Sequence, residues 1–294
     1  MFEVLRKSLA TGVVTAPYPP PAAEVSTWGR GRPEIDFAGW KDARAAVAAC
    51  PTGALAHEER EGTRSVALDL GKCTFCGLCA DADNSIRMTN LRELAVRRKA
   101  DLTRTAKYRL APDGSHQECL EVSAGKAGGG GAGRVVPEAP GAPPQGRESF
   151  EALGAELRST IHRVLGRSLH IREVDAGSCN GCEIEIAGLN SPVYDIERFG
   201  IHFVASPRHA DMLLVTGPVS RNMELALRKT YDATPAPRLV VAVGACGCSG
   251  GIFGENYASL GGVDKVVPVD VYIPGCPPNP YALLQGILLA VGRV

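Results

Sequence analysis

Short apolar runs alternate with helical stretches in the second half of the chain. Continuous apolar runs predict four buried strands, at residues 169–174, 212–216, 239–243 and 269–273. Between them, residues 221–232 carry apolar side chains at helical spacing, and residues 280–291 predict a C-terminal helix. Strands of this kind, separated by helices, are typical of a parallel sheet covered on both faces. We therefore expect an α/β domain of flavodoxin-like architecture, whose ligands bind beyond the carboxyl ends of its strands.

Composition divides the chain into three regions. Residues 1–111 predict a compact α+β domain with a group of cysteines in its middle, and residues 151–294 predict the parallel-sheet domain. Between them, residues 112–150 are rich in glycine and proline. Glycine-rich chain is flexible, proline-rich chain is semi-rigid, and neither can bury a core. We expect this middle region to be a linker between the two domains.

The charge balance narrows the possible functions. The 294 residues include 32 basic and 32 acidic side chains, so the formal net charge is zero, and aromatic residues make up only 5%. Nucleic-acid binders normally carry a basic excess and aromatic stacking platforms, so we expect no nucleic-acid partner. No apolar run approaches the ~20 residues of a membrane span, and the start resembles neither a secretory signal nor a twin-arginine signal. These features predict a cytoplasmic protein.

The ten cysteines are the most informative residues. A disulfide framework would require export, which nothing in the sequence predicts, and the cysteines fall instead in short groups that are typical of metal sites. Bacterial ferredoxins use Cys-x2-Cys-x2-Cys-x3-Cys-Pro runs. This chain has two incomplete copies. The second keeps Cys73, Cys76 and Cys79 but has Asp83 at the fourth position, whereas the first keeps only its fourth cysteine, Cys50.

The missing cysteines follow a simple pattern once the fourth cysteine of each run is assigned to the other run's cluster, as in two-cluster ferredoxins. One predicted cluster has lost every ligand, at the positions of Trp40, Ala43, Ala46 and Asp83. The other keeps all four, which are Cys50, Cys73, Cys76 and Cys79. We predict a ferredoxin-like domain with a single [4Fe–4S] cluster. A structural zinc site with four cysteine ligands is the alternative, although such sites usually pair two Cys-x-x-Cys knuckles.

The remaining cysteines follow predicted strands of the second domain. Cys179 and Cys182 come after the first strand, Cys246 after the third and Cys276 after the fourth. Because the carboxyl ends of parallel strands meet at one rim of a sheet, these cysteines are expected to converge there.

Both halves of the chain resemble known subunits. The first ~110 residues, through the run ending at Cys79, resemble the polyferredoxin-like subunit of formate hydrogenlyase with one cluster missing. The second domain resembles the small subunit of group 4, energy-converting [NiFe] hydrogenases, and also the terminal-cluster subunit of complex I. The motifs that carry this resemblance lie at residues 179–185, 206–211, 244–251 and 268–278. The chain looks like two subunits of one complex fused through a linker.

The resemblance implies a second [4Fe–4S] cluster. Its ligands would be Cys179, Cys182, Cys246 and Cys276. Quinone-reducing relatives carry two adjacent cysteines at the first position, so the Cys-x-x-Cys spacing here favours the hydrogenase branch. Cys248 departs from the family pattern. We expect it to neighbour the cluster and to donate a weak S–H hydrogen bond to a cluster sulfide.

Other polar residues allow two interpretations each. The carboxylates of Glu183 and Glu185, beside the cluster cysteines, could pass protons or pair locally. The basic stretch at residues 92–107 predicts either a solvated surface or a surface that docks on an acidic partner. Cys119, with His116 nearby, offers too few ligands for a metal and predicts a free thiol in a flexible region.

The resemblance implies one-electron transfer by a component that is not catalytic alone. Electrons would enter from a donor subunit or a soluble ferredoxin and pass to the [NiFe] site of a hydrogenase-type large subunit. Membrane-arm subunits would hold the chain on the cytoplasmic face of the inner membrane. Two alternatives remain open, namely a complex I-like or nickel-free relay and a zinc-stabilised scaffold protein.

Overall fold

The computed structural model describes residues 2–11, 30–89, 91–92, 94–124 and 146–292. Up to residue 124 its elements are α1 (Phe2–Thr11), β1 (Pro33–Ile35), α2 (Arg44–Ala49), β2 (Leu55–Arg60), β3 (Thr63–Asp69), α3 (Leu78–Ala82), β4 (Ile86–Met88), the 3₁₀ helix η2 (Lys99–Leu102), β5 (Thr103–Leu110) and β6 (His116–Ala124). From residue 146 they are α4 (Gly146–Leu165), β7 (Leu169–Asp175), α5 (Gly181–Gly188), η3 (Ile196–Phe199), β8 (Ile201–Phe203), η4 (Pro207–His209), β9 (Met212–Thr216), α6 (Arg221–Ala233), β10 (Leu239–Val243), α7 (Gly244–Ser249), η5 (Val263–Lys265), β11 (Val271–Ile273) and α8 (Pro280–Val291).

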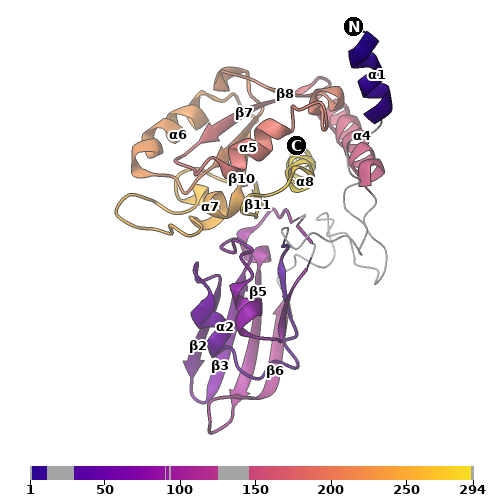
Figure 1. Ribbon diagram of the computed structural model, residues 1–294. Helices are drawn as coiled ribbons and strands as arrows, with labels where there is room; N and C mark the ends of the chain where they lie inside the picture. Colours follow the sequence, from indigo (N-terminus) through magenta and orange to yellow (C-terminus); the bar gives the residue numbers. More distant parts are fainter. Residues whose placement is uncertain (1, 12–29, 90, 93, 125–145, 293–294) are drawn as a thin grey trace.

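Residues 30–124 form an N-terminal body built on antiparallel strands (Figure 1). Its main sheet has the order β2-β3-β5-β6, and β1 pairs separately with β4. The segments β1-α2-β2 and β3-α3-β4 are two similar halves, because β1 pairs with β4 and β2 pairs with β3. The residues that follow α2 and α3 therefore occupy equivalent positions in the two halves.

Residues 146–292 form a C-terminal body around five parallel strands in the order β8-β7-β9-β10-β11. Numbered along the chain this is the 2-1-3-4-5 order of flavodoxin-like folds. The predicted fold class is confirmed. Every residue of β9 and β10 is buried, as their continuous apolar runs predicted. The sequence analysis missed β8, a strand of only three residues.

The described parts of the predicted linker contain regular structure. Residues 116–124 form β6, which pairs with β5, and residues 146–150 begin α4. The other residues of this region, 125–145, lie outside the described residues. The sequence between β5 and β6 makes a tight turn, because Gly114 has a φ of +81° and the Asp113 carboxylate accepts the Ser115 N–H. The predicted division at residues 111 and 151 otherwise stays a prediction.

The two bodies share one hydrophobic core along a seam. Val96 and Tyr272 pair across it, with N···O distances of 3.0 and 2.8 Å in the two directions. Tyr272 belongs to β11, and Val96 lies in the segment that enters η2. Nearby, Lys99 lies 3.0 Å from the Asp264 carboxylate, and Arg97 donates to the Leu289 carbonyl oxygen. Part of the basic stretch at residues 92–107 therefore binds the C-terminal body of the same chain.

Candidate metal centres

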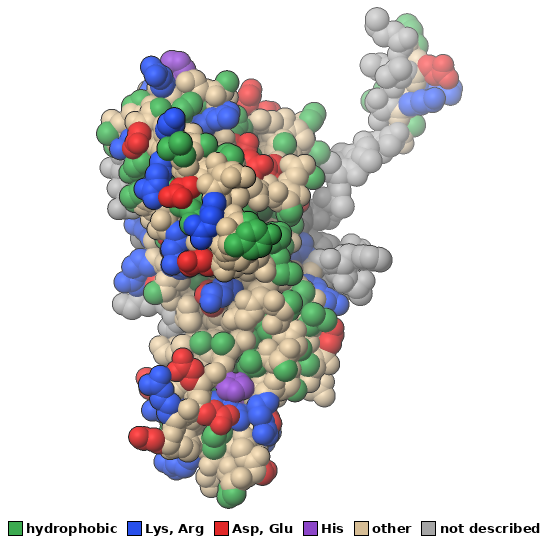
Figure 2. Space-filling view, turned by 90° about the vertical axis from the view of Figure 1, so that its left-hand side faces the viewer, with side chains coloured by type: hydrophobic (Ala, Val, Ile, Leu, Met, Phe, Trp, Pro, Cys, Tyr) green, Lys and Arg blue, Asp and Glu red, His purple; other side chains and the backbone are tan. Residues whose placement is uncertain are grey.

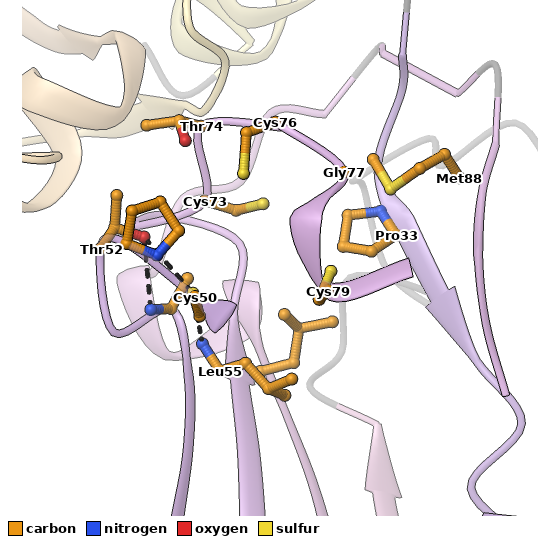
Figure 3. Close-up of a pocket in the computed structure, with 13 residues that line it drawn as sticks. Pro33, Cys50, Thr52, Leu55, Cys73, Thr74, Cys76, Gly77, Cys79 and Met88 are labelled. Carbon is orange, nitrogen blue, oxygen red and sulfur yellow. Dashed lines mark hydrogen bonds between the residues drawn. The ribbon is translucent and has the colours of Figure 1, made fainter. Parts of the chain in front are cut away.

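Four cysteines of the N-terminal body surround one cavity. Cys50, Cys73, Cys76 and Cys79 line one pocket together with apolar side chains (Figure 3). Cys50 directly follows α2, whereas the other three lie around the start of α3. The structure thus brings the distant Cys50 to the later run, as the crossed-ligand rule predicted.

Backbone N–H groups of this site donate hydrogen bonds to the sulfur atoms. The N–H of Leu55 donates to Cys50 Sγ, and the N–H of Phe75 donates to Cys73 Sγ, each over 3.4 Å. Phe75 and Gly77 have φ values of +56° and +84°, so the chain turns tightly around the thiols. Such N–H groups stabilise anionic sulfur in iron–sulfur sites.

The raised pKa values of the thiols also fit a site that holds a positively charged group. Burial raises the pKa of Cys73 to about 12, although its hydrogen bond from Phe75 lowers the pKa and neighbouring cysteines raise it further. Burial likewise raises the pKa of Cys79, and Cys50 adds to that effect. Several thiolates packed here need positive charge to compensate them, and bound iron would supply it. The donor set therefore fits a [4Fe–4S] cluster.

Side chains fill the positions of the missing ligands. The Trp40 indole N–H donates to Asp83 Oδ2 over 2.6 Å, so two of these positions contact each other. Trp40 is only 2% exposed, and Ala43 and Ala46 are fully buried beside it in the same core. The place where a two-cluster ferredoxin would hold its other cluster is packed in this chain.

Trp40 also contacts a buried histidine. Its carbonyl oxygen lies 3.0 Å from Nδ1 of His116, so that nitrogen carries the proton and donates. Arg64 donates to the other ring nitrogen over 3.2 Å, and the His116 ring stacks on Tyr108 with 3.8 Å between centroids. Burial lowers the pKa of His116, and the Arg64 charge contributes, which keeps the imidazole neutral.

The second set of thiols lies at the carboxyl ends of the parallel strands. Cys179 and Cys182 follow β7, Cys246 lies in α7 directly after β10, and Cys276 follows β11. Burial raises the pKa of Cys246 to about 11, and Cys276 and Cys179 raise it further. Burial also raises the pKa of Cys182, with contributions from Glu183 and then from the other three cysteines. The four predicted residues therefore form one electrostatically coupled group.

Two glycines make room for this set. A Cβ on Gly244 would lie 2.6 Å from Cys182 Sγ, and one on Gly251 would lie 2.8 Å from Cys246 Sγ. Both glycines also have a positive φ, +80° and +55°. Any other residue at these positions would therefore meet both a steric clash with sulfur and an unfavourable backbone conformation. Gly244 and Gly251 therefore allow the backbone after β10 to come close to the cysteine sulfur atoms.

Two carboxylates lie beside the second set. Within the described residues, both oxygens of Glu183 and Oε1 of Glu173 are buried without a hydrogen-bond partner. Burial raises the pKa of Glu173, and the Glu183 carboxylate raises it further. Glu183 was among the expected residues, whereas Glu173 was not, because only the folded chain brings a residue of β7 near the start of α5. Glu183 lies in the first turn of α5, and the choice between proton transfer and a local role for Glu183 or Glu185 stays a prediction.

The two other cysteines take no part in either set of four. Cys248 is fully buried, and its thiol donates to the Ala242 carbonyl oxygen over 3.8 Å. The hydrogen bond expected from Cys248 to a cluster sulfide is therefore wrong, since the thiol points into the core. Cys119 lies in strand β6, opposite Tyr108, and not in the flexible region that the sequence suggested.

Among the described helices, none combines the length and the apolar character that a membrane span requires.

Comparisons with known proteins agree with the second set of thiols. A family model described as NADH ubiquinone oxidoreductase, 20 Kd subunit, matches residues 179–290, which include all four cysteines of that set. The chain is 51% identical over 138 residues to formate hydrogenlyase subunit 7 of Escherichia coli (strain K12), covering 47% of this chain and 54% of that protein. It thus spans about half the length of that relative.

Two further relatives extend this result. A probable membrane-bound hydrogenase subunit, mbhJ of Pyrococcus furiosus, is 47% identical over 45% of this chain and 79% of its own length. A subunit of the NADH-quinone oxidoreductase of Desulfovibrio desulfuricans is 52% identical over 36% of this chain and 58% of its own length. These relatives are oxidoreductase subunits, and one of them is aligned over most of its length. The chain belongs to the family of the 20 kDa subunit of NADH ubiquinone oxidoreductase.

Proposed function

We propose that this chain is an electron-transfer subunit with two [4Fe–4S] clusters, part of a membrane-bound group 4 [NiFe] hydrogenase that resembles formate hydrogenlyase. The family binds an iron–sulfur cluster. The observation that carries the proposal is the presence of two separate sets of four thiols in one chain. When bound, each cluster would accept and release single electrons.

The first set would be Cys50, Cys73, Cys76 and Cys79, and the second would be Cys179, Cys182, Cys246 and Cys276. Structural zinc sites usually pair two Cys-x-x-Cys knuckles, whereas the first set combines a Cys-x2-Cys-x2-Cys run with the distant Cys50, and this ferredoxin pattern supports a cluster over a zinc ion.

The complexes of the relatives suggest which subunits this chain would contact. The large subunit would cover the second set of thiols, where Cys179 and Cys276 are exposed. The loop after α7 exposes Ile252 and Phe253 directly after Gly251, the glycine that approaches Cys246. Figure 2 shows hydrophobic side chains among charged ones on the face that it draws. An apolar rim of this kind fits a permanent subunit contact. A donor subunit or ferredoxin would contact the N-terminal body, and membrane-arm subunits would hold the complex on the cytoplasmic face.

A complex I-like or nickel-free relay is the second candidate, supported by the similarity to the NADH-quinone oxidoreductase relative. The Cys-x-x-Cys spacing at Cys179 and Cys182 favours the hydrogenase assignment over it. The sequence of the partner large subunit would decide, since a [NiFe] site requires two Cys-x-x-Cys pairs there.

The cofactor content tests the proposal. Anaerobically purified chain should contain about eight iron and about eight acid-labile sulfide, because each cluster has four of each. Cys50→Ala and Cys246→Ala should each lower the iron content to about four, whereas the control Cys119→Ser should keep about eight. Zinc in place of iron after anaerobic reconstitution would support a scaffold protein and end the electron-transfer proposal.

A further inference from the structure

The end of helix α7 touches the N-terminal body. Ser249 Oγ lies 2.8 Å from the carbonyl oxygen of Gly71 and 3.0 Å from that of Ala245. The Ala245 contact is the usual bond of a serine to its own helix. The Gly71 contact crosses the seam, and Gly71 lies two residues before the thiol Cys73.

Ser249 is connected to the second thiol set as well. The N–H of Gly251 donates to Ser249 Oγ over 3.3 Å, and Gly251 packs directly on Cys246 Sγ. One hydroxyl thus contacts the backbone beside Cys246 on one side and the backbone beside Cys73 on the other. The described residues between the two thiol sets are tightly packed here, since a Cβ on Gly71 would lie 3.1 Å from the Leu102 side chain.

The hydrogen bonds of Ser249 place the turn before Cys73 next to α7, the helix that carries Cys246. Burial raises the pKa of Cys276, and Cys179 and then Cys76 of the N-terminal body raise it further. Figure 3 shows the turn with Thr74 and Cys76 on the side of the cavity that faces the ribbon of the C-terminal body. Other contacts of the seam, such as the Val96–Tyr272 pair, hold the bodies together independently of Ser249.

We propose that Ser249 is a positioning residue that fixes the separation of the two clusters by tying α7 to the turn before Cys73. The inference rests on the proposed function, because it requires a cluster in each body. If both thiol sets hold clusters, these clusters would supply one-electron exchange between the bodies, and Ser249 would fix how the two thiol sets face each other. Because the other seam contacts keep the bodies attached, the contact between Ser249 and Gly71 would adjust only the local placement of the turn before Cys73 relative to the helix that carries Cys246.

The test compares Ser249→Ala, Ser249→Thr and a matched control. Ser259→Ala serves as the control, because its buried hydroxyl donates to the Pro218 carbonyl within the same body. In fully reduced protein, electron paramagnetic resonance reports the magnetic interaction between the clusters. Ser249→Ala should keep about eight iron but weaken this interaction, and amides of residues 70–73 should exchange about fivefold faster, as expected for one lost hydrogen bond. Ser249→Thr should restore both values.

A second variant approaches the same contact from the other body. In Gly71→Ala the added methyl group would press on Leu102 and approach Cys248, so it should weaken the interaction without removing a hydroxyl. An unchanged interaction in both Ser249→Ala and Gly71→Ala, equal to that of the control, would overturn the role of Ser249. Wild-type protein with about four iron would instead overturn the proposed function, before any seam variant is measured.

Discussion

Replacing Asp83 tests how the N-terminal body filled the place of its missing cluster. The Asp83 carboxylate accepts the Trp40 indole N–H over 2.6 Å and the Ser85 N–H over 2.8 Å. Trp40 is 2% exposed, so in Asp83→Ala its N–H loses its partner in a buried place. A hydrogen bond to a charged group contributes about 1.5–3 kcal/mol. We therefore expect Asp83→Ala to lower the free energy of unfolding by about 2 kcal/mol. Asp83→Asn keeps an acceptor and should lower it by about 1 kcal/mol.

Native-state hydrogen exchange is the suitable assay, because loss of a cluster would make bulk unfolding irreversible. A change of about 2 kcal/mol corresponds to about 30-fold faster exchange for the most protected amides of β3 and β5. The amides of β9 and β10 in the other body provide the internal reference. Cluster content is measured on the same samples as iron and visible absorption.

The expected result separates structural from ligand positions. Asp83→Ala should keep about eight iron, whereas Cys50→Ala should keep only about four. Loss of iron from Asp83→Ala with full retention in Cys50→Ala would show that the ligands come from one local run, and the crossed assignment would be wrong. Unchanged exchange in Asp83→Ala would refute the energetic reasoning about Trp40.

Three other substitutions address the second set of thiols and the pH dependence of stability. Gly244→Ala should lose about four iron, because its methyl group would collide with the Cys182 sulfur. Gly254 is the control, because it also has a positive φ but has open space around it. Gly254→Ala should keep its iron and lower the free energy of unfolding by only about 1–2 kcal/mol through backbone strain. Cys248→Ala should keep about eight iron and lower the free energy of unfolding by about 1–2 kcal/mol, because that thiol fills the core and binds no cluster. The folded pKa of His116 lies below its ordinary value of 6.5, so the unfolded chain binds the extra proton and stability falls as the pH drops below 6.5 through the folded pKa. In His116→Gln, hydrogen exchange should therefore depend less on pH over this window, and an unchanged dependence would contradict the assignment of a neutral histidine.

The sequence predicted most of the C-terminal body because its signals are local. Strands β9 and β10 are buried along their whole length, and their apolar runs show it directly. Cysteines that follow strands of a parallel sheet must meet at one rim, so the convergence of Cys182 and Cys246 required no knowledge of the loops. Strand β8 was missed because its three residues carry too little pattern to distinguish it from a loop.

The features that escaped prediction depend on contacts between distant segments. The turn at Asp113 and Gly114 contains the signals of a hairpin, but the glycine and proline beyond it suggested a linker. The pairing of Val96 with Tyr272 joins residues far apart in the chain, and neither has a local feature that marks it. The same holds for Glu173 beside Glu183, because only the folded chain brings these residues of β7 and α5 near each other.

The thiol site that this chain retains lies nearer the C-terminal body than the site that Trp40 fills. Trp40, which fills the missing site, packs on Tyr108 and His116 of the antiparallel sheet. Cys76 of the retained site instead lies close enough to the C-terminal body to affect the acidity of Cys276. Under the proposed function, a relay between the two bodies would need only the cluster nearest the seam, since an electron that reached it would already be beside the second set. The proposed route between the bodies would therefore not require the other cluster, and the buried Trp40 side chain with its bond to Asp83 fills the place where that cluster would lie.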